Sequence, residues 1–267
     1  MNFRYEKWEA TGNDFVVVDL NPVSLNTEDF TPELVRQVCD RKAGIGADGV
    51  VLLDFSCVPV RMVIINSDGS PSGMCGNALR CVAQILKKRT GKIEGSVVLG
   101  DRTIETSVDS DGLASVVLGP PQGVPGHEPY ASSSALDNLL GRGYLLWFGN
   151  PHNVVPVERL PVDWVDQGKD AQDIAAEQLG TGGINCGFLQ TSPTDGIYPL
   201  RVYERGAGVT QSCGSGACAA SAVLERELQV PPPHRLELLG GVLTVGRAPG
   251  GFTLAGAARQ EFEGEWL

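Results

Sequence analysis

The sequence predicts an α/β protein of the α+β kind, built from two copies of one unit. Short apolar, β-branched runs typical of strands recur along the chain, and few helical segments separate them. A cysteine-glycine pair stands before an expected helix twice, at Cys75 and at Cys213. A Pro/Gly/Ser-rich passage, residues 119–134, lies near the middle. We therefore expect one domain over residues 1–119 and another over residues 120–256.

The expected elements follow this pattern in order along the chain. Strands are expected at residues 15–19, 49–53, 61–66, 115–119, 153–157, 200–204, 235–239 and 241–245. A first helix is expected over residues 31–40, because Thr31 can cap it and Pro32 suits its first position. Further helices are expected over residues 78–88 and 217–227, and a fainter helical pattern covers residues 170–179.

The two copies agree in spacing as well as in order. Asn66 ends one expected strand nine residues before Cys75, and Glu204 ends another nine residues before Cys213. Each half therefore runs strand, glycine-containing loop, Cys-Gly, helix. Two such units related by a pseudo-two-fold axis would bring both cysteines into one cleft.

Composition excludes several classes of function. The formal charge of −11, from 21 basic and 32 acidic residues, argues against nucleic acid as a partner. The N-terminal residues lack a signal peptide, and no run approaches the roughly 18 apolar residues of a membrane span, so we expect a cytoplasmic protein that binds no membrane.

The seven cysteines are expected to be thiols, because their number is odd and a reducing compartment disfavours disulfides. The chain contains no Cys-x-x-Cys pair, which argues against structural zinc and predicts no metal site. Cys39, Cys57 and Cys186 stand among apolar neighbours, so we expect them in the core.

A thiol at a helix start is the feature that indicates chemistry. Unpaired backbone N–H groups and the helix dipole favour the thiolate, so the pKa of such a cysteine is expected to fall below about 8.5. The glycines that follow, Gly76 and Gly214, allow N–H groups to approach a carboxylate closely. Inverting a stereocentre needs a base on one face of the carbon and an acid on the other. One thiolate and one thiol meet that need.

Six segments, in order over nearly the whole chain, resemble the diaminopimelate epimerase family. They are ATGNDFVVVD from Ala10, GIGADG from Gly44, NSDGSPSGMCGNALRC from Asn66, GNPHNVV from Gly149, INCGF from Ile184 and RVYERGAGVTQSCGSGACA from Arg201. The match has local departures, since the family often has His-Gly where Glu9 and Ala10 stand and Gly-Ala where Ala78 and Leu79 stand. Neither departure changes a proton-transfer group.

The resemblance implies a set of site residues. Cys75 and Cys213 would be the acid/base pair, and His152 and Glu204 the polar groups that tune them. Main-chain groups at Gly76, Asn77, Gly214 and Ser215 would hold the reacting-end carboxylate. The distal end of the substrate would be recognised at Asn13, Asn66, Asn150, Asn185, Glu204 and Arg205. A guanidinium such as that of Arg205 can bind a second carboxylate bidentately.

The resemblance also implies a fold and an activity. Each domain would be a curved, mainly antiparallel sheet wrapped around a central helix, with a last strand over residues 257–267 returning to the first domain. The activity would be interconversion of LL- and meso-diaminopimelate without pyridoxal phosphate or another cofactor. The family further suggests a homodimer and a role in lysine and peptidoglycan precursor biosynthesis.

Other interpretations remain open from the residues alone. GIGADG, residues 44–49, matches a dinucleotide-binding pattern, but it follows a helix and precedes a strand, so we expect a loop. A racemase of the same fold for histidine or proline would share the two thiols. A thiol redox protein would cycle the two cysteines through a disulfide, and a noncatalytic module would use the cleft only to bind anions.

Overall fold

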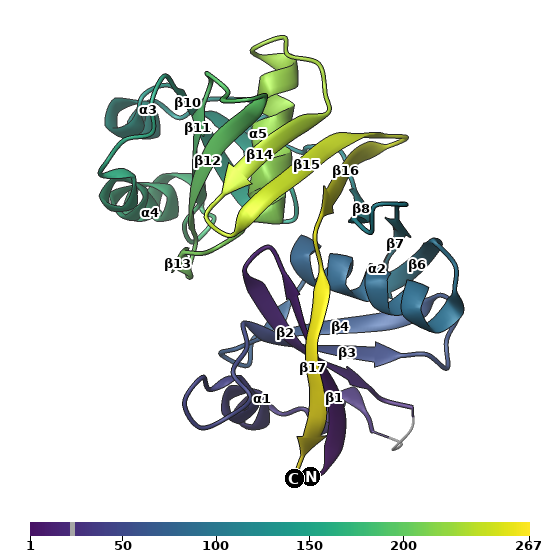
Figure 1. The fold of residues 1–267 in the computed structure, drawn as a ribbon. Coiled ribbons are helices and arrows are strands. Elements are labelled where there is room, and N and C mark those ends of the chain that lie inside the picture. The colour runs from purple at the N-terminus through teal and green to yellow at the C-terminus, as the bar shows by residue number, and fades with distance from the viewer. Residues whose placement is uncertain (22–24) are drawn as a thin grey trace. The chain divides into compact units, whose positions relative to one another are not determined.

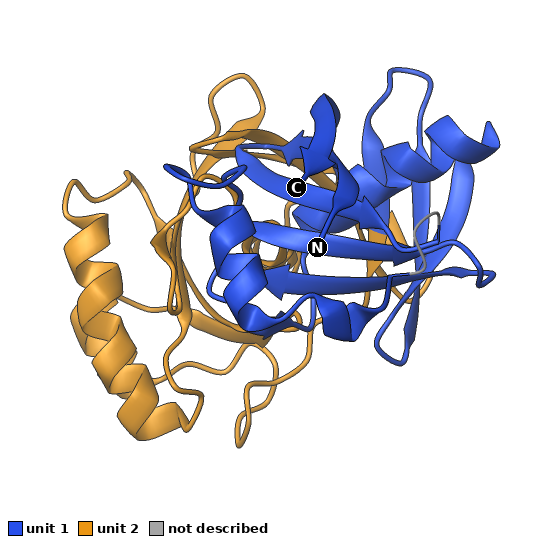
Figure 2. Cartoon of the chain, turned by 90° about the horizontal axis from the view of Figure 1, so that it is seen from below, with its two compact units in different colours: residues 1–116, 255–267 blue, residues 117–254 orange. Residues whose placement is uncertain are grey.

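The computed structural model describes residues 1–21 and 25–267. The chain forms two compact units, coloured separately in Figure 2: unit 1 comprises residues 1–116 and 255–267, and unit 2 comprises residues 117–254. The chain passes from unit 1 to unit 2 within β8 (Ala114–Leu118) and returns within β16 (Gly251–Gly256). Unit 1 is therefore discontinuous in sequence, whereas unit 2 is one continuous segment.

Unit 1 contains a mixed sheet, labelled in Figure 1. Its strands are β1 (Phe3–Ala10), β2 (Asn13–Asp19), β3 (Gly49–Asp54), β4 (Val60–Asn66), β5 (Pro71–Ser72), β6 (Glu94–Leu99), β7 (Arg102–Val108), β8 and β17 (Arg259–Trp266). Antiparallel pairs join β17 to β1, β1 to β2, β3 to β4, β6 to β7 and β7 to β8. The pairs β2–β3 and β4–β6 are parallel.

Helix α2 (Gly76–Thr90) is the central helix of unit 1. It packs against strands from both ends of the sheet, β1 and β17 as well as β6 and β7, so the sheet curves around it. All residues from 76 to 86 except Gln84 are buried, including Leu79, Val82 and Ile85. Gly91 ends the helix in the left-handed conformation that only glycine adopts without strain. The shorter helix α1 (Pro32–Cys39) packs against β3 on the other face.

Unit 2 contains a second mixed sheet. Its strands are β9 (Tyr144–Trp147), β10 (Pro151–Val157), β11 (Asn185–Gln190), β12 (Ile197–Glu204), β13 (Gly208–Val209), β14 (His234–Leu238), β15 (Gly241–Ala248) and β16. The pairs β9–β10, β11–β12, β12–β13 and β14–β15 are antiparallel. The pairs β10–β11 and β12–β14 are parallel.

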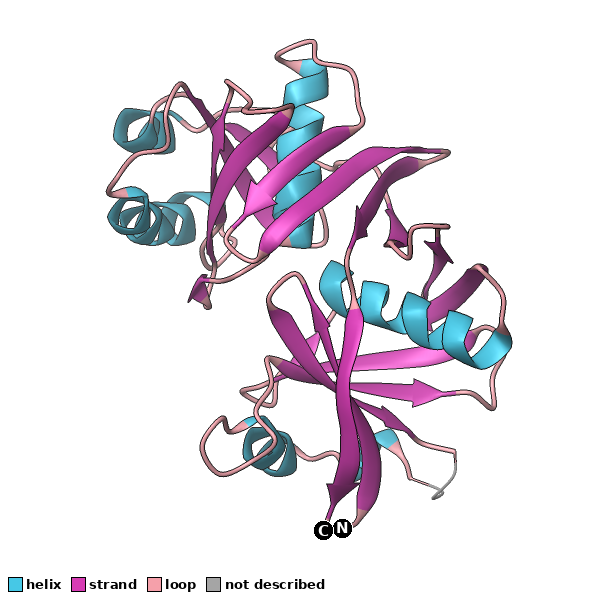
Figure 3. Cartoon of the chain, in the orientation of Figure 1, coloured by secondary structure: helices cyan, strands magenta, loops and turns pink. Residues whose placement is uncertain are grey.

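Helix α5 (Gly214–Arg226) is the central helix of unit 2 and packs against β9, β10, β11, β12 and β15. Its alanines, among them Ala217, Ala219 and Ala222, are fully buried because strands approach the helix closely. Two outer helices, α3 (Ser134–Leu140) and α4 (Trp164–Leu179), bury Leu136 and Ala171 in a separate core cluster. Figure 3 shows both units as strands around a helix.

The two units repeat one topology. In unit 1 the pairings run parallel, antiparallel, parallel and antiparallel through β2, β3, β4, β6 and β7. In unit 2 they run in the same sequence through β10, β11, β12, β14 and β15. The central helix lies between the third and fourth strands of each series. The predicted α+β class and the repeat of one unit are confirmed.

Most predicted elements are present, with corrected boundaries. All eight predicted strands overlap observed ones, and Thr31 caps α1 by accepting a hydrogen bond from Leu34 N at 3.3 Å. Helix α4 begins six residues before the predicted 170–179 and includes Gly168. This glycine lies against β12, because a Cβ there would meet the Tyr203 side chain at 2.4 Å. Residues 44–48 form the expected loop before β3.

The cysteines follow the prediction with one exception. All seven belong to the described residues, and they form no disulfide. Cys39 and Cys186 are buried as expected. Cys57 is not in the core, because it lies in the turn after β3, where its Sγ donates to Asp54 Oδ2 at 3.6 Å.

Among the helices of residues 1–21 and 25–267, none is both long and apolar enough to cross a membrane.

Candidate active site

Cys75 is the N-cap residue of α2. Its backbone is extended, with φ −145°, and its Sγ accepts a hydrogen bond from Ala78 N at 3.5 Å. Gly76 and Asn77, the next two residues, are buried in the first turn. The sulfur therefore lies against the positive end of the helix dipole, as the sequence predicts.

A chain of amide hydrogen bonds links the start of α2 to the strands. Asn77 Nδ2 donates to Asn13 Oδ1 at 2.9 Å, and Asn13 Nδ2 donates to Asp48 Oδ2 at 3.0 Å. Asn13 begins β2 and Asp48 directly precedes β3, so the parallel pairing of these strands brings the two residues together. We call Asn13, Asp48, Cys75 and Asn77 the Cys75 cluster.

Asn66 lies close to this cluster but is not hydrogen-bonded into it by its amide. It is the last residue of β4, exposed and paired in register with Gly49, the residue after Asp48. Its Nδ2 donates to Ser70 Oγ at 3.0 Å. The adjacent Ser67 N donates to Asp48 O at 3.0 Å, which holds the end of β4 beside the cluster.

Cys213 is the N-cap residue of α5 and is 3% exposed. Its Sγ lies 3.7 Å from Ser215 Oγ, and that hydroxyl lies 3.0 Å from His152 Nε2. Gly216 allows close packing behind the sulfur, since a Cβ there would make tight contacts with Cys213 Sγ and Val202 Cγ2, each at 3.2 Å. Cysteine, serine and histidine thus form one line of contacts at the helix start.

The sequence-based expectation of a lowered pKa is wrong for Cys213. Burial, and after it the nearby Glu204 carboxylate, raise the pKa of this thiol well above its usual value. Hydrogen bonds from Ser215 and from the Gly216 backbone act in the opposite direction but are outweighed. Cys213 therefore carries its proton at neutral pH in this structure.

His152 is also neutral near pH 7. The ring is 1% exposed, and burial, with a smaller contribution from the Arg205 charge, lowers its pKa to about 3. Asn185 Nδ2 lies 3.4 Å from His152 Nε2, so an amide N–H faces the unprotonated nitrogen. The residue can polarise the Ser215 hydroxyl but does not supply a positive charge.

Glu204 ends β12 and is held by Thr210. Thr210 Oγ1 donates a short hydrogen bond to Glu204 Oε1, and the two-residue strand β13 pairs Glu204 with Gly208. The tight return of the chain after β12 therefore fixes the carboxylate beside Cys213.

Arg205 is oriented by three hydrogen bonds. Its backbone N donates to Asn185 Oδ1 at 2.7 Å, Nη1 donates to Thr181 O at 2.6 Å, and Nη2 donates to Asn150 Oδ1 at 3.3 Å. Gly183 makes room for it, because a Cβ there would lie 3.0 Å from Arg205 Cγ and the residue has φ +115°. The predicted residues of unit 2 thus gather in one place, the Cys213 cluster: Asn150, His152, Asn185, Glu204, Arg205, Cys213, Gly214 and Ser215.

Three residues in or next to these clusters were not predicted from the sequence. Asp48 lies in the GIGADG loop, where its partner Asn13 is far away in sequence, so only the strand pairing reveals it. Thr210 stands six residues after Glu204, a spacing that carries no signal without the β12–β13 return. Arg80 lies on α2, where an arginine is ordinarily solvent-facing, yet it is fully buried.

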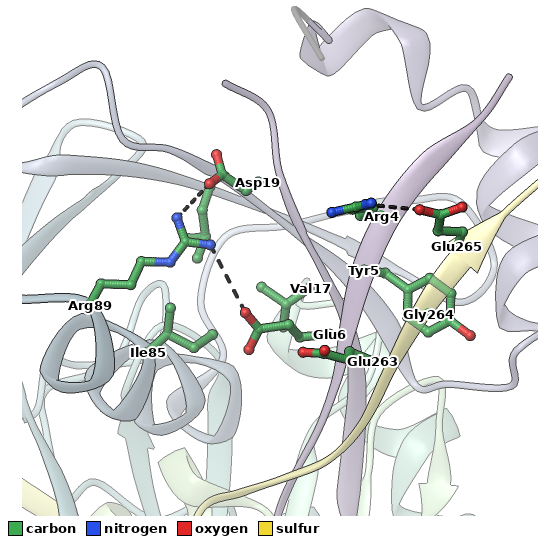
Figure 4. Close-up of a pocket in the computed structure, with 11 residues that line it drawn as sticks. Arg4, Tyr5, Glu6, Val17, Asp19, Ile85, Arg89, Glu263, Gly264 and Glu265 are labelled. Atoms are coloured by element: carbon green, nitrogen blue, oxygen red, sulfur yellow. Dashed lines mark hydrogen bonds and ion pairs between the residues drawn. The ribbon is translucent and has the colours of Figure 1, made fainter. Parts of the chain in front are cut away.

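A separate groove in unit 1 does not fit an acidic substrate. It has a volume of about 520 Å³ and lies at the far end of α2, beside Ile85 and Arg89. Figure 4 shows Arg89 directed at Asp19 and Glu6, and Arg4 paired with a glutamate of β17. Both arginines of the groove are thus engaged with carboxylates.

In the described part of the chain, no group of three or more His, Cys, Asp or Glu side chains could hold a metal ion.

Comparison with known proteins identifies the family. The diaminopimelate epimerase model matches residues 6–124 and 144–249. A curated diaminopimelate epimerase of Coxiella burnetii (strain Dugway 5J108-111) is 33% identical over 287 aligned residues, which cover 100% of both chains. The chain belongs to the diaminopimelate epimerase family. It is therefore an isomerase of the epimerase type, as the resemblance implied.

Solved structures that resemble the chain share its fold at low identity. A PhzF-family phenazine biosynthesis protein of Bacillus anthracis has a TM-score of 0.75 at 15% identity, covering 100% of this chain and 99% of that one. A hydroxyproline epimerase of Agrobacterium vitis, solved with bound trans-4-hydroxy-L-proline, has a TM-score of 0.70 at 16% identity, covering 99% and 91%. The fold is thus shared by proteins that carry different names, and activity must be argued from the clusters.

Proposed function

We propose that the protein interconverts LL- and meso-diaminopimelate with Cys75 and Cys213 as the acid/base pair. One observation carries the proposal: each unit places a cysteine at the N-cap of its central helix, at the same point of a repeated topology. A single capping cysteine has an ordinary structural explanation. Two matched ones, in a member of this family, supply the two proton-transfer groups that inversion requires.

The proton balance of the proposed reaction is simple. One cysteine thiolate takes the α-proton from one face of the substrate and becomes a thiol. The other cysteine thiol gives its proton to the opposite face and becomes a thiolate. The enzyme ends with the two roles exchanged, so the same pair serves the reverse direction, and the proposed reaction needs no cofactor.

The helix starts would stabilise the charge that develops as the proton leaves. Backbone N–H groups at Gly76 and Asn77, and at Gly214 and Ser215, are the proposed donors to the reacting carboxylate. Each well-aimed donor in a water-excluded site is worth roughly 3–4 kcal/mol of transition-state stabilisation. The Glu204 carboxylate beside Cys213 raises the pKa of this thiol, which favours the protonated form that gives its proton to the substrate.

The distal amino-acid end is proposed to bind through amide groups and Arg205. The guanidinium already has fixed orientation from Asn150 and Thr181. A bidentate contact with a second carboxylate would therefore cost little further ordering of this side chain. Asn13, Asn66 and Asn185 are proposed to bind the same end, which would favour a substrate with two amino-acid ends over histidine or proline.

The test is incubation of reduced protein with LL-diaminopimelate in deuterated water, followed by chiral chromatography and mass spectrometry. We expect the meso isomer with one solvent deuterium at the inverted carbon, without added cofactor. Isomerisation without solvent deuterium would contradict proton abstraction. If diaminopimelate stays unchanged while histidine or proline exchanges its α-proton, the protein is a racemase for that amino acid instead.

The cellular setting is part of the same proposal. We propose a cytoplasmic homodimer that acts in lysine and peptidoglycan precursor biosynthesis, with diaminopimelate as its small-molecule partner and neither nucleic acid nor membrane as a partner. The net charge of −11 supports the exclusion of nucleic acid. Analytical ultracentrifugation of the purified chain tests the dimer, because a sedimentation mass near 28.3 kDa would indicate a monomer.

A further inference from the structure

Arg80 is a fully buried cation behind the Cys75 cluster. It lies on α2, five residues after Cys75, and its side chain is 0% exposed. Nη2 donates to Asn77 Oδ1 at 2.5 Å, and Nη1 donates to Thr11 Oγ1 at 2.9 Å and to Ala257 O at 2.8 Å. Every one of these acceptors, in the part of the chain that the structure describes, is an oxygen of a neutral group.

A buried charge held only by neutral oxygens is costly. Burial lowers the pKa of Arg80, yet an arginine side chain stays protonated in proteins. The titratable groups whose charges act on it are Cys81, Cys75 and Glu9. Glu9 is engaged elsewhere, since Oε2 lies 3.3 Å from Arg259 Nε.

Cys81 cannot provide the compensating charge either. It is fully buried, and burial raises the pKa of this thiol far above neutrality. Cys75 is only partly buried and caps the helix that carries Arg80. Besides Glu9, which is engaged elsewhere, the anions that can offset the buried guanidinium are the Cys75 thiolate and a carboxylate bound at the same helix start.

The repeated topology supplies an internal comparison. The position five residues after the capping cysteine is Arg80 in unit 1 and Cys218 in unit 2. Both side chains are 0% exposed, so the same buried position holds a cation in one unit and a neutral side chain in the other. The helical repeat therefore does not require an arginine there.

The residues that end the two matching strands also differ in charge, and here the charged residue is in unit 2. The residue nine positions before the capping cysteine is the neutral Asn66 in unit 1 and the carboxylate Glu204 in unit 2. The Glu204 charge raises the pKa of Cys213, which favours the protonated thiol there. Glu204 thus favours the protonated thiol in unit 2, whereas the matching strand end of unit 1 carries no charge.

We infer that Arg80 is a positioning residue for the reaction: it fixes Asn77 and, through it, Asn13, and its charge favours the Cys75 thiolate and a bound carboxylate. The inference rests on the proposed function for its catalytic meaning. Its direct consequence, a Cys75 that reacts as a thiolate at neutral pH, needs no substrate to be observed.

The test is the rate at which iodoacetamide alkylates Cys75 between pH 6 and pH 10, measured by mass spectrometry of the Cys75 peptide. We expect Arg80→Met to lower the rate at pH 7 about tenfold and to move the profile to higher pH, because thiolate is the reactive form. Arg80→Lys should recover most of the rate, since it retains the charge. Circular dichroism first verifies that each variant is folded.

Arg89→Met is the matched control. Arg89 lies on the same helix, but Asp19 and Glu6 neutralise its charge (Figure 4). This variant should alkylate like the wild type. An Arg80→Met chain that is folded and keeps the wild-type profile would overturn the inference, as would equal slowing by Arg89→Met.

If Arg80→Met does not fold, Arg80→Gln is compared with Arg80→Lys. Slower alkylation of Arg80→Gln than of Arg80→Lys at pH 7 supports the inference, and equal rates, or a wild-type midpoint at or above the value of about 8.5 for an ordinary cysteine, overturn it. Diaminopimelate turnover is measured separately. A chain that passes the alkylation test but does not epimerise diaminopimelate would refute the proposed function and leave the role of Arg80 intact.

Discussion

Acid should destabilise the protein through His152, and the size of the effect follows from its burial. The ring has a folded-state pKa of about 3, against about 6.5 for an unperturbed histidine. Below pH 6.5 the unfolded chain takes up a proton that the folded chain refuses. The stabilisation is therefore complete above pH 6.5 and is lost as the pH falls toward 3. Between pH 7 and pH 5 the loss amounts to about 2 kcal/mol in the free energy of unfolding.

The assay is urea denaturation at pH 7 and at pH 5 for the wild type and for His152→Gln. We expect the wild type to lose about 2 kcal/mol more than the variant over this interval, because glutamine does not titrate. The buried His234, whose pKa burial also lowers, is present in both chains and cancels in the comparison. His127→Gln, in a loop outside the Cys213 cluster, should behave like the wild type.

Direct titration of the His152 ring is the decisive test. The ring proton signals of His152, followed by nuclear magnetic resonance, should remain those of neutral imidazole down to pH 5. A midpoint near 6.5 would refute the reasoning, because it would mean that the buried ring accepts a proton without resistance. An equal loss of stability in the wild type and in His152→Gln would have the same meaning.

Three further predictions concern the two cysteines and Arg205. Cys75→Ser and Cys213→Ser should each lower kcat for epimerisation by at least about a hundredfold, because a serine hydroxyl is a much weaker acid, and substantial turnover of either variant would remove that cysteine from its role. Ser215→Ala should raise the pKa of Cys213 further and slow its alkylation, since a hydrogen bond to the sulfur is lost; an unchanged pH profile would contradict this. Gly183→Ala should destabilise the chain by about 1 kcal/mol and raise the KM by displacing Arg205, which thermal melts and steady-state kinetics would measure.

The predictable part of the fold is the part with strong local signals. The strands β3 and β4 are runs of Val, Ile and Leu, and α1 begins with the unambiguous Thr31-Pro32 pair. The missed strands β1 and β7 have the sequences FRYEKWEA and RTIETSV, in which charged and polar residues interrupt the apolar ones, so neither forms an apolar run. The seven-residue helix α3 is too short for helical periodicity to be recognised.

The candidate site divides in the same way. Cys75 and Cys213 could be located from the sequence because they precede glycine at helix starts, a local pattern with a physical reason. The protonation of Cys213 could not, since it depends on burial and on the distance of Glu204 in the folded chain. The local sequence shows where a helix begins, and hence where its dipole lowers the pKa of a cysteine. The burial that raises the pKa of Cys213 comes from strands that are far away along the chain.

The discontinuity of unit 1 sets an order on folding during synthesis. Residues 117–254 emerge from the ribosome as one uninterrupted segment, so all of the strands and helices of unit 2 can associate as soon as they are available. The first strand, β1, must wait for β17, its partner at the very end of the sequence, with which it pairs from Phe3 to Glu9. The sheet of unit 1, although begun first, is therefore completed only after unit 2 has been made. Truncation before β17 would leave unit 1, not unit 2, incomplete.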